Sequence, residues 1–368
     1  MDTWPSFPLE DDVKRVRDLV KRYFSIYEEQ PGQVNTFYID VPSHPGLLDN
    51  YFEQLRLDLK ETGYIPFLQR EGGEYVLHIT RKPRVKTRPE WLNWVLLAAT
   101  VVTTMLSGSL LFLEEWSVAG MLKPANMLDG LVFFSVPLLL ILGIHELGHY
   151  YVSKKHHVAA SLPFFIPIPP NPVLPLGTLG AVISMREPIP NRRALIEIGI
   201  AGPIAGFLVS IPVCLAGLFL MQENPVLVDS LEGTLTIHFP LLLQAMSQLF
   251  AIPENAVIHP TAFAGWVGLL VTAINLLPAG QLDGGHIARG ALRDRHKYAS
   301  FGAIALLIVS ALFGGPWIFF AFFIVFIIGV GHPPALNEHV PLDGRLKALA
   351  LLAVVIFVLS FIPVPISG

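Results

Sequence analysis

The chain has 368 residues, of which 52% are hydrophobic and 15% are charged, and its formal net charge is -4. A soluble domain has about 25% charged residues, so this composition excludes an ordinary soluble protein and indicates a polytopic membrane protein. The net charge excludes the basic surface that binds nucleic acid, and the single cysteine, Cys214, excludes an intramolecular disulfide and a zinc site built from cysteines.

Residues 1–88 are expected to form a small soluble α+β domain. The N-terminus is acidic and lacks the apolar stretch of a cleavable signal peptide. Gly72 and Gly73 separate two strand-like runs and predict a hairpin. We expect helices from the amphipathic patterns at 11–29 and 44–63, and strands at 34–42, 64–70 and 74–80.

Residues 89–368 are expected to form a membrane domain that is all-α apart from a membrane-associated β-region, with about six to seven transmembrane helices. A basic collar at 81–91 precedes it, and the other Lys and Arg residues recur in alternate loops. By the positive-inside rule, the N-terminal domain is cytosolic and the protein is integral to a membrane, which we take to be the cell membrane. The spans are predicted at 91–113, 131–152, 194–221, 261–277, 299–313, 316–330 and 348–362.

The second predicted span carries the sequence His145-Glu146-Leu147-Gly148-His149. On a helix the two histidines are one turn apart on one face and can bind one metal ion, while Glu146 lies beside them to transfer protons. A chance pair of histidines is the alternative. A charge at the centre of a membrane span costs about 2.5 to 3.5 kcal/mol, so the apolar surroundings favour a metal site. His145 lies about 21 Å along the helix from Leu131, at about 1.5 Å per residue, and therefore within the membrane.

A catalytic zinc ion uses three protein ligands, so a third ligand is expected from another segment at a similar depth. The candidate is Asp283. Pro278 and Gly280 interrupt the preceding helix and let the chain turn back toward the bundle. The triplet Leu-Asp-Gly recurs at Asp343, but in a polar loop without the preceding N-x-x-P motif, and we expect Asp343 to be a loop or cap residue.

Three motifs occur in this order along the chain: HELGH at 145–149, GIAGPIAG at 199–206, and N-x-x-P followed by LDGG at 275–285. This arrangement resembles the site-2 protease family of intramembrane zinc metalloproteases, M50-type, in a branch without PDZ or CBS domains. The resemblance implies one Zn²⁺ held by His145, His149 and Asp283, with Glu146 as general base and acid. It also implies that Asn275 contacts the substrate backbone; a hydrogen bond between helices is the other interpretation of Asn275.

The segment 178–185 is rich in β-branched residues and glycine and predicts a strand that pairs with an unwound substrate, with an ordinary loop as the alternative. The proline-rich segment 161–177 before it predicts a re-entrant loop. His286, His332 and His339 are expected to be polar packing or loop residues, although His286 could also support the ligand Asp283. His156 and His157 are expected at the membrane interface.

These features favour a zinc-dependent endopeptidase that cuts a transmembrane segment of a membrane-anchored protein, in regulated intramembrane proteolysis. The alternative is a non-enzymatic metal-binding transporter or chaperone, and a structural scaffold is a third class. Glu146 distinguishes the endopeptidase from the metal-binding transporter or chaperone, because a site that only holds metal does not need a carboxylate beside the histidine pair.

Overall fold

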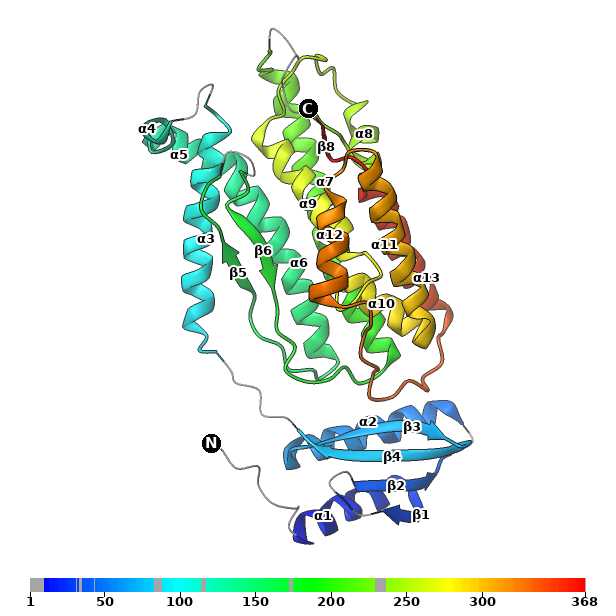
Figure 1. Cartoon of the computed structure of the whole chain (residues 1–368). Helices are drawn as coiled ribbons and strands as arrows, with labels where there is room; N and C mark the ends of the chain where they lie inside the picture. Colours follow the sequence, from blue (N-terminus) through cyan, green and yellow to red (C-terminus); the bar gives the residue numbers. More distant parts are fainter. Residues whose placement is uncertain are drawn as a thin grey trace.

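The computed structural model describes residues 10–30, 32, 35–42, 44–82, 88–113, 117–171, 175–228 and 236–367. It is mostly helical, with a bundle of helices beside a small N-terminal α+β unit (Figure 1). Within the described residues, three helices are long and apolar enough to cross a membrane, at Trp91–Leu110, Pro124–Lys155 and Arg192–Glu223. The helices found at the other predicted spans are shorter, so the count of six to seven spans stays a prediction, as does the domain boundary at residue 88.

The N-terminal unit contains a four-stranded antiparallel sheet with the strand order β1-β2-β4-β3. The predicted hairpin is confirmed, since β3 and β4 are joined by Gly72 and Gly73, both with positive φ. The predicted helix at 11–29 is wrong in its second half, where β1 pairs with β2 instead. Backbone pairing with the sheet outweighs the local helical pattern there, and Tyr27 packs against Tyr38. The elements are α1 (Glu10–Lys21), β1 (Ser25–Gln30), β2 (Asn35–Asp40), α2 (Pro45–Thr62), β3 (Tyr64–Glu71) and β4 (Glu74–Arg81).

The N-terminal unit shares its core with a segment from near the other end of the chain. Leu336 is buried in the same apolar cluster as Phe52 and Leu55 of α2. Its carbonyl accepts a hydrogen bond of 2.8 Å from the backbone N–H of Leu68 in β3, and its own N–H donates to Ile189. This shared core fixes the N-terminal unit against the helical bundle.

The helical bundle is built around α7, which packs directly on α6, α9 and α10, while α6 also packs on α9. The remaining helices surround these four, and α6 continues an apolar helix that begins at Pro124. Residues 83–87 of the predicted basic collar lie outside the described residues. The helices are α3 (Trp91–Leu110), α4 (Val118–Met121), α5 (Pro124–Gly130), η1 (Leu131–Ser135), α6 (Val136–Lys155), α7 (Arg192–Glu223), α8 (Leu241–Ser247), α9 (Pro260–Asn275), α10 (Asp283–Leu292), η2 (Arg293–Arg295), α11 (His296–Leu312), α12 (Trp317–Phe323), η3 (Ile324–Ile328) and α13 (Gly344–Ser360).

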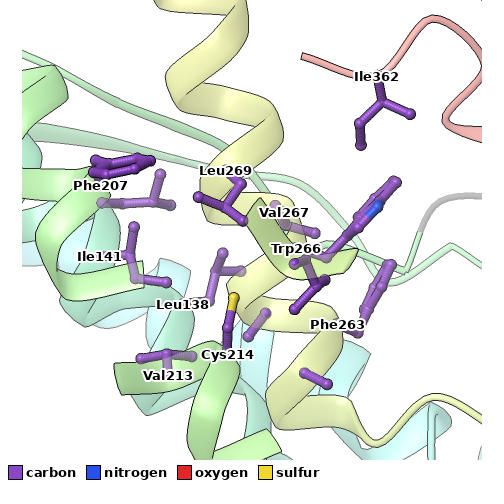
Figure 2. Packing of buried hydrophobic residues seen from close by; sticks show 14 of the residues in the cluster. Leu138, Ile141, Phe207, Val213, Cys214, Phe263, Trp266, Val267, Leu269 and Ile362 are labelled. Atoms are coloured by element: carbon purple, nitrogen blue, oxygen red, sulfur yellow. The ribbon is translucent and has the colours of Figure 1, made fainter. Parts of the chain in front are cut away.

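Small residues let α7 lie close to α6 on one side and to α9 on the other. A Cβ added to Gly148 would lie 2.7 Å from the carbonyl oxygen of Ala201, and one added to Gly265 would lie 2.5 Å from Sγ of Cys214. Glycine is required at such close approaches. Figure 2 shows the apolar side chains that pack around Cys214, among them Leu138, Ile141, Phe207, Val213, Phe263, Trp266, Val267 and Leu269.

A two-stranded ribbon lies between α3 and α6, with β5 (Phe164–Pro167) toward α3 and β6 (Thr178–Val182) toward α6 (Figure 1). The strand predicted at 178–185 is confirmed over the range of β6. The re-entrant loop predicted at 161–177 is corrected in part, because β5 pairs with β6 there; residues 172–174 lie outside the described part.

Helix α3 holds the ribbon at both ends. Asn93 donates a hydrogen bond of 2.8 Å to the carbonyl of Leu162, and Thr103 donates one of 2.7 Å to the carbonyl of Gly177. The other short strands, β7 (Thr236–Ile237) and β8 (Ile366–Ser367), pair with each other and tie the end of the chain to the bundle.

Candidate metal centre and catalytic site

His145 and His149 lie one turn apart on α6, as their spacing predicts. Both side chains are buried, at 3% and 5% exposure. Their Nε2 atoms face each other at 3.2 Å. The Nδ1 atom of His149 lies 2.8 Å from the carbonyl of Ile198 in α7. This carbonyl can only accept, so Nδ1 carries the proton and Nε2 keeps a free lone pair for a metal ion.

Asp283 is brought to the same point by the turn between α9 and α10. Its Oδ2 atom lies 3.2 Å from Nε2 of His145 and 3.2 Å from Nε2 of His149. The turn is tight: a Cβ added to Gly284 would lie 2.1 Å from the carbonyl oxygen of Leu276. Glycine after Asp283 therefore allows α10 to begin directly against the end of α9.

The three atoms form a nearly equilateral triangle with edges of 3.2 Å, and this group is the candidate metal site found among the described residues. Zinc binds nitrogen and oxygen ligands at about 2.0–2.1 Å in a tetrahedron, whose corners are then about 3.3–3.4 Å apart. The triangle fits three corners of that tetrahedron and leaves the fourth for water or substrate. Two neutral imidazoles and one carboxylate also leave bound Zn²⁺ with a net positive charge.

Helix α7 leaves the space that the histidine rings occupy. A Cβ added to Gly202 would lie 2.0 Å from Nε2 of His149, and one added to Gly206 would lie 3.0 Å from Nδ1 of His145. The glycines at 199–206 predict close helix packing from sequence. The contact between Gly202 and the ligand atom itself depends on how α7 is rotated against α6, and no sequence signal indicates it.

Glu146 and Asn275 lie beside the triangle on different helices. Glu146 is 6% exposed, and the backbone of Ile183, directly after β6, lies close to its carboxylate. The Nδ2 atom of Asn275, the last residue of α9, lies 3.3 Å from Nε2 of His145. The structure therefore brings together the five residues singled out from the sequence, and it adds the end of β6 to the site.

The remaining histidines and the second Leu-Asp-Gly triplet take part in other contacts. His286 hydrogen-bonds His332, whose backbone N–H donates to His296. His156 pairs with Glu197 at 2.9 Å. Asp343 caps α13 by accepting a hydrogen bond of 2.8 Å from the N–H of Leu346, which confirms the prediction that it is a cap residue. None of these groups belongs to the ligand triangle.

Comparisons with known proteins match this part of the chain. Residues 133–315 match peptidase family M50. The probable zinc metalloprotease EGY1, chloroplastic, of Arabidopsis thaliana is 28% identical over 96% of this chain and 71% of its own length. The corresponding EGY2 of the same plant is 31% identical, over 62% of this chain and 41% of its own length. EGY1 of Oryza sativa subsp. japonica is 30% identical, over 60% and 38%.

The match to the peptidase family covers α6, α7, α9 and α10. These helices carry the ligand triangle, Gly202 beside the ring of His149, and the turn before Asp283. The aligned part is less than half the length of the second and third relatives. The described residues between the ligand-bearing helices form the ribbon and helices given above, with neither a PDZ nor a CBS domain among them. Residues 133–315 form a domain of peptidase family M50, the site-2 protease family.

Proposed function

We propose that the protein is a zinc-dependent intramembrane endopeptidase that hydrolyses a peptide bond in or near a transmembrane segment of a membrane-anchored protein. The observation that carries this proposal is the triangle of the buried His145 and His149 with the partly buried Asp283, and the buried carboxylate of Glu146 beside it. A site that only stores or transports metal does not need that carboxylate. One Zn²⁺ per chain matches the one group of this kind among the residues that the structure describes.

When bound, zinc supplies a Lewis acid that polarises the scissile carbonyl and makes water more acidic. Glu146 takes the proton from the attacking water and delivers it to the departing amine. Asn275 donates its amide N–H to the substrate backbone, where it stabilises developing negative charge on the carbonyl oxygen. In the structure this amide lies 3.3 Å from Nε2 of His145. A zinc ion bound at Nε2 would take up that lone pair and leave the amide N–H free for the substrate.

The ribbon supplies a surface for an extended substrate. Among the described residues β6 pairs with β5 alone, so its second edge has no strand partner. The end of this strand reaches Glu146 through Ile183. A substrate segment that pairs with the open edge would bring its backbone next to the catalytic carboxylate, and strand pairing accepts any sequence that can unwind.

We propose that the protein spans the membrane many times and that the N-terminal domain is cytosolic. Lys154 and Lys155 end α6 on the side where the N-terminal domain docks, which fits the positive-inside rule. The lipid bilayer surrounds the remaining faces, where large apolar side chains such as Leu312, Phe319 and Phe326 are exposed. Cleavage near this side would release a cytosolic fragment of the substrate in regulated intramembrane proteolysis.

The replacement Glu146→Gln is expected to lower the cleavage rate by about 10²- to 10⁴-fold, because the amide cannot accept the proton of water. Zinc content should remain at the wild-type value, since Glu146 is not a ligand. The measurement is cleavage of a panel of single-span membrane proteins by purified protein in detergent, with bound zinc quantified in each sample.

Glu254→Gln is the control, because Glu254 is exposed in a loop away from the site and should keep full activity. Equal cleavage by wild type and Glu146→Gln would contradict the catalytic role. A wild-type protein that holds zinc, cuts no substrate of the panel and moves zinc across vesicle membranes would support the transporter instead.

A further inference from the structure

The ribbon of β5 and β6 continues beyond its two named strands to the N-terminal domain. The N–H of Ser161 donates to the carbonyl of Ser184 at 3.0 Å, and the N–H of Arg186 donates to the carbonyl of Ala159 at 2.7 Å. The backbone pairing therefore continues beyond the end of β6, past Ile183 beside the catalytic carboxylate, as far as residue 186. The next residue, Glu187, ends it.

Glu187 is held by three donors, two of which come from the N-terminal domain. Its carboxylate accepts hydrogen bonds from Lys60 of α2 at 2.8 Å, from Lys82 after β4 at 2.5 Å and from the N–H of Ala159 at 3.1 Å. The side chain is 7% exposed. Burial alone would raise the pKa of Glu187, but the bonds from Lys60 and Lys82 outweigh burial and lower its pKa to about 2. The carboxylate is therefore charged at every physiological pH.

The same face of α2 also caps the catalytic helix α6. Arg56 donates to the carbonyl of His156 at 3.1 Å, and Lys60 donates to the carbonyl of His157 at 2.9 Å. These carbonyls follow the last residue of α6, where a helix has unpaired acceptors and a negative dipole end. Lys60 thus contacts both the helix that carries Glu146 and the ribbon that lies against Glu146.

We propose that Glu187, Lys60 and Lys82, here called the Glu187 clamp, are positioning residues that fix the substrate-pairing edge of β6 relative to Glu146. The proposal rests on the proposed endopeptidase function. The clamp acts at the base of the ribbon, while α3 holds its two ends through Asn93 and Thr103. Releasing the clamp frees the ribbon to shift against α6, which weakens strand pairing with the substrate without touching the zinc ligands.

The separate apolar attachment of the N-terminal domain makes this testable. Leu336 is buried in the core of that domain and hydrogen-bonded to β3, so the domain stays docked when the clamp is broken. The effect of removing the clamp should accordingly be local to the ribbon and to substrate binding.

The test uses the full-length protein with Glu187→Gln, Lys82→Gln and the double variant. We expect Glu187→Gln to raise the KM for a cleaved membrane substrate by about tenfold, with a smaller change in kcat and an unchanged zinc content. The double variant should lose little more than Glu187→Gln, because both changes remove the same contact. Amide hydrogen exchange over residues 178–186 should become faster, while exchange in β1 to β4 should not.

Arg81→Gln is the matched control, since it removes a neighbouring ion pair of 3.1 Å to Asp12 inside the N-terminal domain. It should leave KM and ribbon exchange unchanged. Wild-type KM and wild-type ribbon exchange in Glu187→Gln would overturn the clamp. If Glu187→Gln does not fold, Lys82→Gln takes its place, because Glu187 keeps its bonds to Lys60 and Ala159 and stays paired. A smaller rise in KM is then expected, and wild-type KM with wild-type ribbon exchange would overturn the clamp. Failure of the wild-type protein to cut any substrate would instead contradict the proposed function.

Discussion

Replacing Asp283 with asparagine is expected to remove bound zinc and abolish peptide cleavage. Asparagine has the same size and fits the turn between α9 and α10, but it lacks the negative charge that joins the two imidazoles around the metal. Loss of groups that only support metal ligands costs about 10- to 100-fold in metal affinity, so loss of a ligand should exceed about a hundredfold. Metal analysis of the purified variant and a cleavage assay measure both effects.

The chain contains its own control for this change. Asp343 lies in a second Leu-Asp-Gly triplet, where it caps α13. Asparagine is an equally good N-cap residue, so Asp343→Asn should keep zinc and activity. Retention of stoichiometric zinc in Asp283→Asn would show that the third ligand is a different residue.

Replacing Gly202 with alanine is expected to be nearly as damaging, although Gly202 has no functional group. The added Cβ would lie 2.0 Å from Nε2 of His149 and 2.4 Å from Cδ2, far closer than any allowed contact. Either the imidazole or α7 must move, and both movements break the ligand triangle. We expect zinc affinity to fall by more than about a hundredfold, because displacing a ligand should cost more than losing a residue that only supports a ligand.

Gly302→Ala is the control for this substitution. Gly302 is also in a helix, but a Cβ added there meets nothing within 4 Å. Alanine should therefore stabilise α11 slightly, by up to about 1 kcal/mol, and leave zinc in place. If Gly202→Ala keeps the wild-type zinc content and the same helical content, then Gly202 of α7 does not lie against His149 as described.

The parts of the site that follow from local geometry could be predicted from the sequence. His145 and His149 must share a face because the helix repeat brings residues four apart together. Asp283 could be predicted because Pro278 and Gly280 interrupt a helix at membrane depth, where backbone irregularity is costly without a purpose. The small residues at 199–206 similarly predict a close helix contact.

The parts that depend on docking between distant segments could not be predicted. The contact of Gly202 with His149 depends on the rotation of α7, and the contacts of Glu187 with Lys60 and Lys82 join segments more than a hundred residues apart in sequence. The strand β5 was hidden by the prolines around Phe164 and Phe165, which suit an edge strand as well as a loop. Likewise, only the sheet shows that residues 25–30 leave the helical pattern of α1.

The most direct test of the central claim is to map the bond that the purified protein cuts and to ask whether zinc controls the cut. Wild-type protein in detergent is incubated with a cleavable single-span substrate before chelation, after chelation and after zinc is added back, and the products are identified by mass spectrometry. We predict a cut in or beside the apolar segment that disappears on chelation and returns with zinc. A cut confined to the soluble part of the substrate, or one that survives complete removal of zinc, would contradict the account.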